Sequence, residues 1–378
     1  MRRTTFTVIF SLAAAACSGG GGGGAVNGSG GAPSTGSGGA RASGSTGGNA
    51  GTSGGGAAGS GGSSAGTGGA ATSDAGSSGG AMPPADAAVD GADATASGPV
   101  APVMRNGHYA FDIGDITFEV DPQIGGRITT LSIGQSGNLL TGPAVNQTYY
   151  GSTLWTSPES DWRQPPPVTM DSAPFTATAT ATSVTVTGPQ ITAPAAIAGV
   201  SLSKTFSADR RGTIQMEYTL TNHKQAALML APWEVTRVFP GGVTFFPTGT
   251  RTRGAVPTTN SGGITWFTYD AAAINADVKL YADGAEGWLA HADKGLLFIK
   301  KFGDVPAAAI APNEGDVEMY TNKLHTYIEM EDQGAYASIA PGASTTWTVT
   351  WYVRRLPAGV MGTAGEAALV AFVRDTIK

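Results

Sequence analysis

The sequence contains a single cysteine, Cys17, among 378 residues. One cysteine cannot form an internal disulfide, so the folded part of the chain must rely on its hydrophobic core. Charged residues are also few, at 13% of the chain, and the formal net charge is −6. This balance argues against nucleic acid as a partner and against a basic face that binds membranes.

Aromatic residues are absent between Phe10 and Tyr109, and residues 18–100 consist largely of Gly, Ser, Ala and Thr. A segment of this composition cannot bury enough apolar surface to offset its loss of conformational entropy. We therefore expect residues 18–100 to form a disordered tether and residues 101–378 to form one folded domain.

Patterns typical of metal and nucleotide sites are missing as well. No two histidines have the spacing of helical metal ligands, and no Asp-x-Asp-x-Asp run occurs. Outside the tether, no glycine-rich loop precedes a helical pattern. The sequence therefore predicts neither a metal site nor a cofactor.

The chain begins with features of an export signal. Arg2 and Arg3 precede a short apolar run, Phe6 to Ala16. That run is shorter than the roughly 20 apolar residues that a membrane-spanning helix needs. No other apolar stretch of the sequence is long enough to span a membrane.

The apolar run ends in Ala14-Ala15-Ala16-Cys17, which resembles a bacterial lipobox. This resemblance implies that residues 1–17 are a lipoprotein signal, that Cys17 is lipidated, and that the lipid is the only link to a membrane. Ser18 stands where a retention aspartate would otherwise occur, which favours the outer membrane of the cell envelope. An ordinary cleaved signal peptide is the alternative.

The remaining sequence alternates between apolar and polar residues in the manner of half-buried strands. Ile214, Met216, Tyr218 and Leu220 alternate with polar residues, and the segment 347–353 does the same. Further strands are predicted over Ile116–Val120, Arg127–Ile133, Thr176–Thr187, Val200–Phe206, Leu228–Val238, Ile264–Tyr269, Val278–Tyr281, Gly295–Lys301 and Thr326–Glu331.

Many short strands separated by Gly, Pro and Asn predict an all-β fold, a large antiparallel β-sandwich. One helix is expected at the C-terminus. Thr363 and Glu366 have the spacing of a capping box, and an apolar stripe with helical period follows: Leu369, Phe372, Val373 and Ile377.

Three segments together resemble an uncharacterised bacterial domain family of the galactose mutarotase-like group. They are Ile124-Gly-Gly-Arg127-Ile128 followed by Asn138-Leu139-Leu140, then 151–162 with the sequence GSTLWTSPESDW before a proline run, and Tyr327-Ile-Glu329-Met-Glu331 before Pro341-Gly342. Asn222-His223 and the segment 232–237, PWEVTR, fit the same picture. The likeness covers about residues 105 to 357 and implies a supersandwich of two large antiparallel sheets, with a concave sheet that faces a sugar.

In aldose 1-epimerases of this group, a glutamate removes a proton from the anomeric hydroxyl and a histidine protonates the ring oxygen. The resemblance implies that Glu331 is this glutamate, because Glu331-Asp-Gln333 repeats the family spacing. Glu329 is the alternative, since it lies two residues away on the same side of a strand.

The histidine is where this sequence departs from the family. Its position is taken by Trp233, followed by Glu234, and His223 is out of register. His325 or Glu234 would then have to serve as the acid, although a lone histidine is more often structural. A pocket that lacks its acid can still bind sugar.

Six further residues are candidates for binding the ligand: Arg127, Trp155, Trp162, Trp233, Glu234 and Arg237. Together with His325, Glu329 and Glu331, they are expected to line one pocket. Trp155 and Trp162 lie among Pro, Ser, Glu and Asp, which predicts a loop rather than a strand, and Trp233 lies in the register of the family histidine. Arg127 and Arg237 lie in predicted strands, where an arginine either pairs with a carboxylate such as Glu234 or binds a ligand. Trp347 and Trp351 are expected to fill the core.

Two functions remain open from the sequence alone. The first is a non-catalytic, carbohydrate-binding lipoprotein. The second is an enzyme that acts on a sugar with Glu331 as general base: an aldose 1-epimerase-like isomerase, or another carbohydrate-active enzyme such as a lyase or hydrolase on a related scaffold.

Overall fold

The computed structural model describes residues 98–378, and the predicted signal, Cys17 and nearly all of the predicted tether lie outside the described residues. The described residues include three that precede the expected domain start at 101. Pro99 forms an isolated β-bridge with Asp209, and the amide of Val100 donates to the carbonyl of Ala208 at 2.8 Å. No helix among residues 98–378 has both the length and the apolar character to span a membrane.

The described part is built almost entirely from strands. They are β1 (Val103–Arg105), β2 (His108–Ile113), β3 (Ile116–Asp121), β4 (Arg127–Ile133), β5 (Ser152–Ser157), β6 (Thr176–Ala179), β7 (Ser183–Thr187), β8 (Val200–Ala208), β9 (Thr213–Asn222), β10 (Leu228–Val238), β11 (Val243–Gly254), β12 (Thr259–Ser261), β13 (Ile264–Thr268), β14 (Val278–Gly284), β15 (Trp288–Asp293), β16 (Leu296–Phe302), β17 (Val317–Thr321), β18 (Ile328–Gln333), β19 (Ala337–Ile339) and β20 (Ser344–Arg355). The helices are α1 (Val168–Asp171), α2 (Ala367–Thr376) and three 3-10 turns, η1 (Glu159–Asp161), η2 (Ala271–Ala273) and η3 (Ala307–Ala309).

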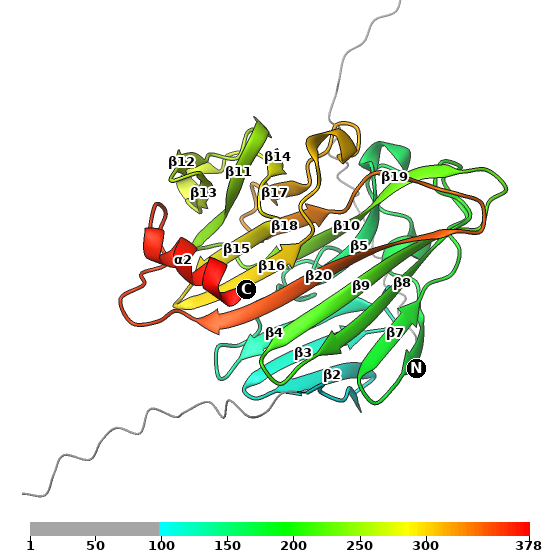
Figure 1. Cartoon of the computed structure of the whole chain (residues 1–378), viewed down its shortest axis with the longest axis horizontal. Coiled ribbons are helices and arrows are strands. Elements are labelled where there is room, and N and C mark those ends of the chain that lie inside the picture. Colours follow the sequence, from blue (N-terminus) through cyan, green and yellow to red (C-terminus); the bar gives the residue numbers. More distant parts are fainter. Residues whose placement is uncertain (1–97) are drawn as a thin grey trace, which may run out of the picture. The chain divides into compact units, whose positions relative to one another are not determined.

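Pairing of the strands gives two antiparallel sheets (Figure 1). The first follows the order β1–β2–β3–β4–β5–β10–β18–β17–β14–β11. The second follows the order β6–β7–β8–β9–β20–β16–β15–β11–β13–β12. Strand β11 belongs to both, because its first half pairs with β13 and β15 and its second half with β14. The predicted all-β, antiparallel fold with a C-terminal helix is confirmed.

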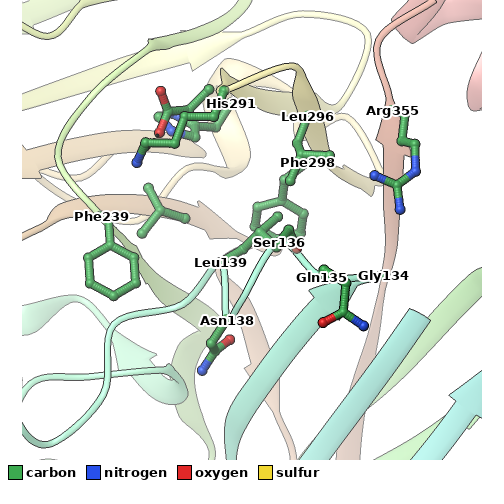
Figure 2. Close-up of a pocket in the computed structure, with 13 residues that line it drawn as sticks. Gly134, Gln135, Ser136, Asn138, Leu139, Phe239, His291, Leu296, Phe298 and Arg355 are labelled. Carbon is green, nitrogen blue, oxygen red and sulfur yellow. Dashed lines mark ion pairs between the residues drawn. The ribbon is translucent and has the colours of Figure 1, made fainter. Parts of the chain in front are cut away.

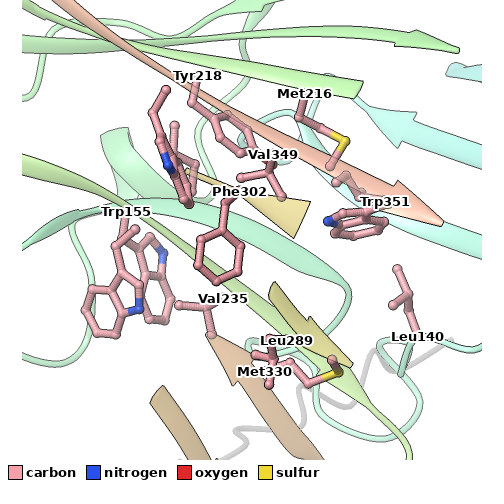
Figure 3. Close-up of a cluster of buried hydrophobic side chains, with 14 of the residues drawn as sticks. Leu140, Trp155, Met216, Tyr218, Val235, Leu289, Phe302, Met330, Val349 and Trp351 are labelled. Atoms are coloured by element: carbon pink, nitrogen blue, oxygen red, sulfur yellow. The ribbon is translucent and has the colours of Figure 1, made fainter. Parts of the chain in front are cut away.

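The main core lies between the two sheets. Phe118 of β3 packs against Phe206 of β8 and Trp351 of β20, with ring centroids 5.9 and 6.0 Å apart. Figure 3 shows Met216, Tyr218 and Val349 of the second sheet beside Trp351 and Phe302 in this cluster. Each large apolar side chain buried here contributes about 1.5–3 kcal/mol. The expected core positions of Trp347 and Trp351 are confirmed by their burial.

A second, smaller core lies on the outer face of the second sheet, where α2 packs. Leu369, Val370 and Val373 of α2 contact strand residues that include Trp266 and Trp288. The predicted capping box is wrong in one respect, because α2 begins at Ala367 rather than just after Thr363. The carboxylate of Glu366 instead accepts the backbone amides of Met361, Gly362 and Thr363.

Two other local predictions need correction. The segment Thr176–Thr187 is not one strand but two, because the Thr180 hydroxyl accepts the amides of Thr182 and Ser183 and turns the chain there. Strands β1, β2, β5, β11, β12, β15, β17 and β19 were missed. Of these, β5 and β15 are buried or nearly so along their whole length, so they lack the apolar–polar alternation that marks a half-buried strand.

Candidate functional site

Three neighbouring strands, β5, β10 and β18, bring distant parts of the sequence together. Trp233 of β10 lies opposite Trp155 of β5, and Arg237 of β10 lies opposite Glu329 of β18. Because alternate residues of a strand point to the same side of a sheet, these side chains share one face of the first sheet. We call this the tryptophan–glutamate face; its residues are Trp155, Trp162, Trp233, Arg237, Glu329 and Glu331.

Three indole rings form the aromatic part of this face. The ring centroid of Trp155 is 5.3 Å from that of Trp233 and 5.5 Å from that of Trp162, which in turn is 6.1 Å from Trp233. Each ring nitrogen donates a hydrogen bond. Trp155 donates to Asp171 Oδ1, Trp162 donates to the Thr156 carbonyl, and Trp233 donates to Glu331 Oε2. These bonds fix the ring orientations.

The position of Trp155 differs from the expectation for it. It lies in strand β5 and is 2% exposed, whereas Trp162 lies just after the turn η1. The loop was predicted from the Pro, Ser, Glu and Asp residues around Trp155, but residues 152–157 form a strand in which all six residues are buried. The segment that follows β5 folds back over the face, since Trp162 packs on both other rings and Asp171 binds Trp155.

A lysine lies at the centre of the polar part of the face. The Lys279 ammonium of β14 is 2.7 Å from Glu318 Oε2 and 2.9 Å from Glu331 Oε2. It also lies 4.6 Å from the ring centroid of Trp233 and 5.2 Å from that of Tyr281. Burial lowers the pKa of Lys279, but the two carboxylates more than offset this and raise it well above its usual value. Lys279 is therefore a fixed cation and is unsuited to attack a carbonyl as a free amine.

Carboxylates outnumber the cations around Lys279. Glu314, Glu318 and Glu331 all lie near this one ammonium. Burial raises the pKa of Glu314 and raises that of Glu318 well above its usual value, and repulsion from Glu331 adds to the shift of Glu318. The cluster is therefore rich in hydrogen-bonding oxygens around a single cation.

Arg237 and Glu329 form the second charged pair of the face. Arg237 Nε donates to Glu329 Oε1 at 2.8 Å, and its guanidinium lies 5.2 Å from the ring centroid of Trp155 and 5.4 Å from that of Tyr149. Burial raises the pKa of Glu329 to about 7, although Arg237 opposes the shift. Glu329 can therefore hold or release a proton near neutral pH.

This shift predicts a pH dependence of stability. The folded state binds the Glu329 proton more tightly than the unfolded state does, so the stabilisation is complete at acid pH and is lost as pH rises through about 7. With about 1.4 kcal/mol for each pKa unit, the loss amounts to roughly 3 kcal/mol. Urea unfolding at about pH 5 and about pH 8 should show this loss in the wild type and a smaller one in Glu329→Gln. An unchanged pH dependence in that variant, as expected for the exposed control Glu217→Gln, would contradict the assignment.

Several polar atoms of this part of the fold are buried without a partner. They include Arg237 Nη2, a donor, and Glu331 Oε1 and Gln333 Oε1, which are acceptors. Leaving such an atom unsatisfied costs about 1–3 kcal/mol. A ligand that carries both hydroxyl donors and oxygen acceptors matches these atoms.

Arg127, the remaining predicted arginine, lies beside this face. Its Nη2 donates to Asp171 Oδ2 at 2.9 Å, and Asp171 Oδ1 accepts from Trp155, so one carboxylate links Arg127 to the aromatic rings. The backbone at Asp171 can approach the chain before β4 because residue 125 is glycine. A Cβ atom at Gly125 would lie 2.0 Å from the Asp171 carbonyl oxygen. Arg127 therefore orients the face rather than contacting a ligand on it.

Glu234 does not belong to the face, which corrects the prediction for this residue. It follows Trp233 directly on β10 and must therefore point to the opposite side, into the core between the sheets. There it accepts from the Tyr218 hydroxyl at 2.6 Å and lies 3.2 Å from the Lys300 ammonium. Glu234 is fully buried and serves as part of an internal charge network.

His325 is also separated from the carboxylates that it was expected to assist. It lies in the exposed turn between β17 and β18 with a φ of 55°, a left-handed conformation that turns the chain. Its Nδ1 lies 2.9 Å from the Tyr269 hydroxyl, with which it hydrogen bonds. The expectation that all nine predicted residues line one pocket is therefore wrong for Arg127, Glu234 and His325.

Three residues of the site were missed from the sequence: Lys279, Glu318 and Gln333. Lys279 lies in a predicted strand, Val278–Tyr281, but was not named as a site residue. Gln333 was considered only because its spacing from Glu331 matches the family. Their position became clear only through the pairing of β14, β17 and β18, which places Tyr281 opposite Glu318 and Glu318 opposite Glu331. The one signal in the sequence was Glu318 itself, the only charged residue of the short strand β17.

The aromatic part of the site reaches the surface beside Trp162. A groove of about 470 Å³ lies there, lined by Trp162 together with Pro165, Pro167, Val168 and Pro194. On the polar side, the Lys279 and Glu329 side chains are 17% and 12% exposed. Among residues 98–378, no group of three or more His, Cys, Asp or Glu side chains is arranged to hold a metal ion.

Residues 110–354 match the model of a family described as a domain of unknown function (DUF4380), and the chain belongs to this family. No curated protein matches the sequence. Solved structures that are similar to the chain include a galactose mutarotase-like protein from Lactobacillus casei, with a TM-score of 0.48 and 12% identity, covering 66% of this chain and 100% of that one.

Two further structures extend this comparison. A galactose mutarotase related enzyme from Lactobacillus acidophilus has a TM-score of 0.49 and 8% identity, covering 67% of this chain and 99% of that one. A galactose mutarotase-like protein from Clostridium acetobutylicum has a TM-score of 0.45 and 9% identity, covering 69% and 99%. At these TM-scores and identities, the likeness decides nothing about ligand or reaction.

Proposed function

We propose that this DUF4380 protein binds a carbohydrate on the tryptophan–glutamate face. The observation that supports this most is the combination of three indole rings within 6.1 Å of one another with unpartnered polar atoms of Arg237 and Glu331. Sugar rings have apolar faces that pack on aromatic rings and hydroxyl edges that need placed donors and acceptors. Arg237 supplies a donor to the sugar, and Glu331 supplies an acceptor.

The ligand enters between the segment 158–171, which folds back over the face, and the partly exposed side chains of Lys279 and Glu329. Trp162 is the residue of the aromatic cluster that borders the surface groove, so a sugar that reaches the face contacts it first. Lys279 and Glu318 then hold Glu331 in place. Because Trp162 is carried by a segment outside the strands, it can move without disturbing the sheet.

Tryptophan fluorescence tests this proposal. Neutral sugars such as D-glucose, D-galactose and N-acetyl-D-glucosamine are titrated into the wild type, Trp162→Phe and Trp266→Phe, the last of which lies under α2. A saturable change in the wild type and in Trp266→Phe that is absent in Trp162→Phe is the expected result. A change that persists in Trp162→Phe would place binding elsewhere and remove the proposal.

A second function, aldose epimerisation, is favoured by one specific observation. Glu329 and Glu331 share one side of β18, and the pKa of Glu329 is about 7 because of burial. Two residues apart on a strand, their Cα atoms are about 7 Å apart, a distance that one sugar ring can bridge. Glu331 would take the proton of the anomeric hydroxyl while Glu329 protonates the ring oxygen; the ring C–O bond breaks, an aldehyde forms, and reclosure returns both protons.

Polarimetry on α-D-glucose and α-D-galactose separates this enzyme from a binding protein. If the epimerase proposal holds, Glu331→Gln and Glu329→Gln should each slow mutarotation by about 10²–10⁴. His325→Gln should leave the rate unchanged, because His325 binds Tyr269 instead. Saturable binding without any rate above that of buffer would retire the enzyme and leave the binding protein.

We further propose that the chain is an exported lipoprotein anchored through Cys17, which displays the domain in the cell envelope, with the outer membrane as the favoured site. The support is the small-residue run that ends at Cys17 and the Gly/Ser-rich sequence that follows it. In cells labelled with palmitate, the wild type should carry label and sediment with membranes. Cys17→Ala should lose both properties, and label retained by this variant would refute the anchor.

A further inference from the structure

A cavity of about 530 Å³ opens between the two sheets, away from the tryptophan–glutamate face. It lies where the turn after β4, the end of β10, the β15–β16 hairpin and the end of β20 meet (Figure 2). Its volume falls within the range of about 300–1,000 Å³ that is typical of small-molecule sites. Val238, which lines it, is one residue beyond Arg237 on β10 and therefore points to the opposite side of the sheet.

The walls of this cavity are apolar on one side and polar on another. Leu139, Leu296 and Phe298 form apolar surface, and the ring of Phe239 is 37% exposed at the side of the cavity. Figure 2 shows Phe239 across the cavity from Arg355, with Leu139 and Phe298 between them. A large, solvent-exposed aromatic ring beside a cavity offers a surface on which a ring-shaped ligand can stack.

His291 provides a hydrogen-bonding group in the cavity wall. Its neighbours on β15, Ala290 and Ala292, pack in the core under α2, so His291 faces the other way, toward the cavity. Its Nδ1 lies 2.9 Å from the Thr244 hydroxyl, which leaves Nε2 for a ligand. Burial lowers the pKa of His291 to about 4, so the ring is neutral at physiological pH and can take either hydrogen-bonding role.

The charges around the cavity cancel in pairs. The Lys294 ammonium is 3.1 Å from Asp293 Oδ2, and Arg355 Nη2 is 2.9 Å from Asp115 Oδ2. With His291 neutral, no charge of either sign is left without a partner for an ionic ligand. A carboxylate or phosphate entering this space would have to break one of these pairs or remain uncompensated.

The other polar residues divide into those that shape the cavity and those that can serve a ligand. All hydrogen bonds of the Asn138 side chain go to the backbone, because it accepts the amides of Leu131 and Leu140 and donates to the Thr129 carbonyl. Gln135 extends from the same turn and lines the cavity with an exposed amide. Asp293 Oδ1 is the oxygen that does not face Lys294.

We propose that this cavity is a second binding site, which takes an uncharged saccharide unit. The sugar stacks its apolar face on Phe239 and directs hydroxyl groups to His291 Nε2, the Gln135 amide and Asp293 Oδ1. The site is independent of the tryptophan–glutamate face, because the two lie on opposite sides of the first sheet. It makes the domain bivalent for sugar.

The four histidines of the chain make this site directly observable, since His291 is the only one that lines the cavity. Long-range ¹H–¹⁵N spectra of the imidazoles are recorded while D-glucose, D-galactose, N-acetyl-D-glucosamine and D-glucuronate are added, and the His291 signals are assigned with His291→Gln. At least one neutral sugar should shift the His291 Nε2 signal in a saturable manner. D-glucuronate should bind at least about tenfold more weakly than that neutral sugar.

Variants outside the core connect the shift to the cavity. Phe239→Ala should weaken binding of the sugar that shifts His291 by about tenfold. Met104→Ala, which replaces an exposed apolar residue of β1, should leave that affinity unchanged. Glu331→Gln and Trp162→Phe should also leave the His291 shift unchanged, so failure of the tryptophan–glutamate face and failure of this site are separable. The site is refuted by the absence of a shift with every neutral sugar, by equal affinity in Phe239→Ala, or by equal binding of D-glucuronate.

Discussion

Lys300→Met should lower the free energy of unfolding by about 3–5 kcal/mol. The Lys300 ammonium is fully buried, lies 3.2 Å from Glu234 Oε2, makes an ion pair with Asp332 and donates to the Met330 carbonyl at 3.0 Å. Burial raises the pKa of Asp332 well above its usual value, and Lys300 opposes this shift. Removing one partner of a buried ion pair leaves the other charge uncompensated in the core.

Urea unfolding of Lys300→Met and Lys294→Met measures this effect. Lys294 is 78% exposed, so its replacement should change stability by less than about 0.5 kcal/mol. Adding Glu234→Gln to Lys300→Met should restore part of the loss, because it removes the orphaned charge. Equal, small effects of both single lysine substitutions would show that Glu234 is solvated, and would return it to the ligand site from which the structure removes it.

Trp155→Ala should cost about 3–5 kcal/mol of stability and also abolish sugar binding on the tryptophan–glutamate face. Trp155 is 2% exposed, contacts both other indoles of the face, lies under the Arg237 guanidinium and donates to Asp171. Its loss leaves a cavity and removes a partner of the carboxylate that also holds Arg127. The packing of the three indole rings and the orientation of the Asp171 carboxylate therefore both depend on Trp155.

Trp162→Ala provides the matched comparison, since Trp162 is 8% exposed and is carried by a segment outside the strands. Its replacement should abolish sugar binding to the same extent but cost markedly less stability. Thermal unfolding and sugar titration of both variants give the two quantities. Equal destabilisation by the two substitutions would mean that Trp162 is a core residue and not the entrance to the site.

The sequence predicted those parts of the fold that have one buried and one exposed face. Alternation identified β9 and β20, where Tyr218 and Trp351 point inward. It failed for β5 and β15, because strands that are covered on both faces carry no alternation to read. Their burial depends on what packs over them: the segment 158–171, which folds back over β5, and the distant helix α2, which covers β15.

The same limit applied to the site. Arg237 and Glu329 were both predicted, and the antiparallel register of β10 and β18 places them opposite each other. Glu234 was assigned to the same pocket as Trp233, although it directly follows Trp233 in the strand. Adjacent residues of a strand point to opposite faces, so the two side chains cannot share one pocket. Lys279 and Glu318 were missed because they reach Glu331 only through the order of strands in the sheet, which no local pattern encodes.

Calorimetric titration of neutral sugars into the wild type, Glu331→Gln and Glu217→Gln tests the proposed function most directly. Glu331 Oε1 is an unpartnered acceptor on the tryptophan–glutamate face, whereas Glu217 lies on the exposed side of β9. We expect heat of binding in the wild type and in Glu217→Gln, with affinity reduced by about tenfold or more in Glu331→Gln. Identical affinity in all three proteins, or no binding heat that exceeds dilution for any neutral sugar, would contradict it.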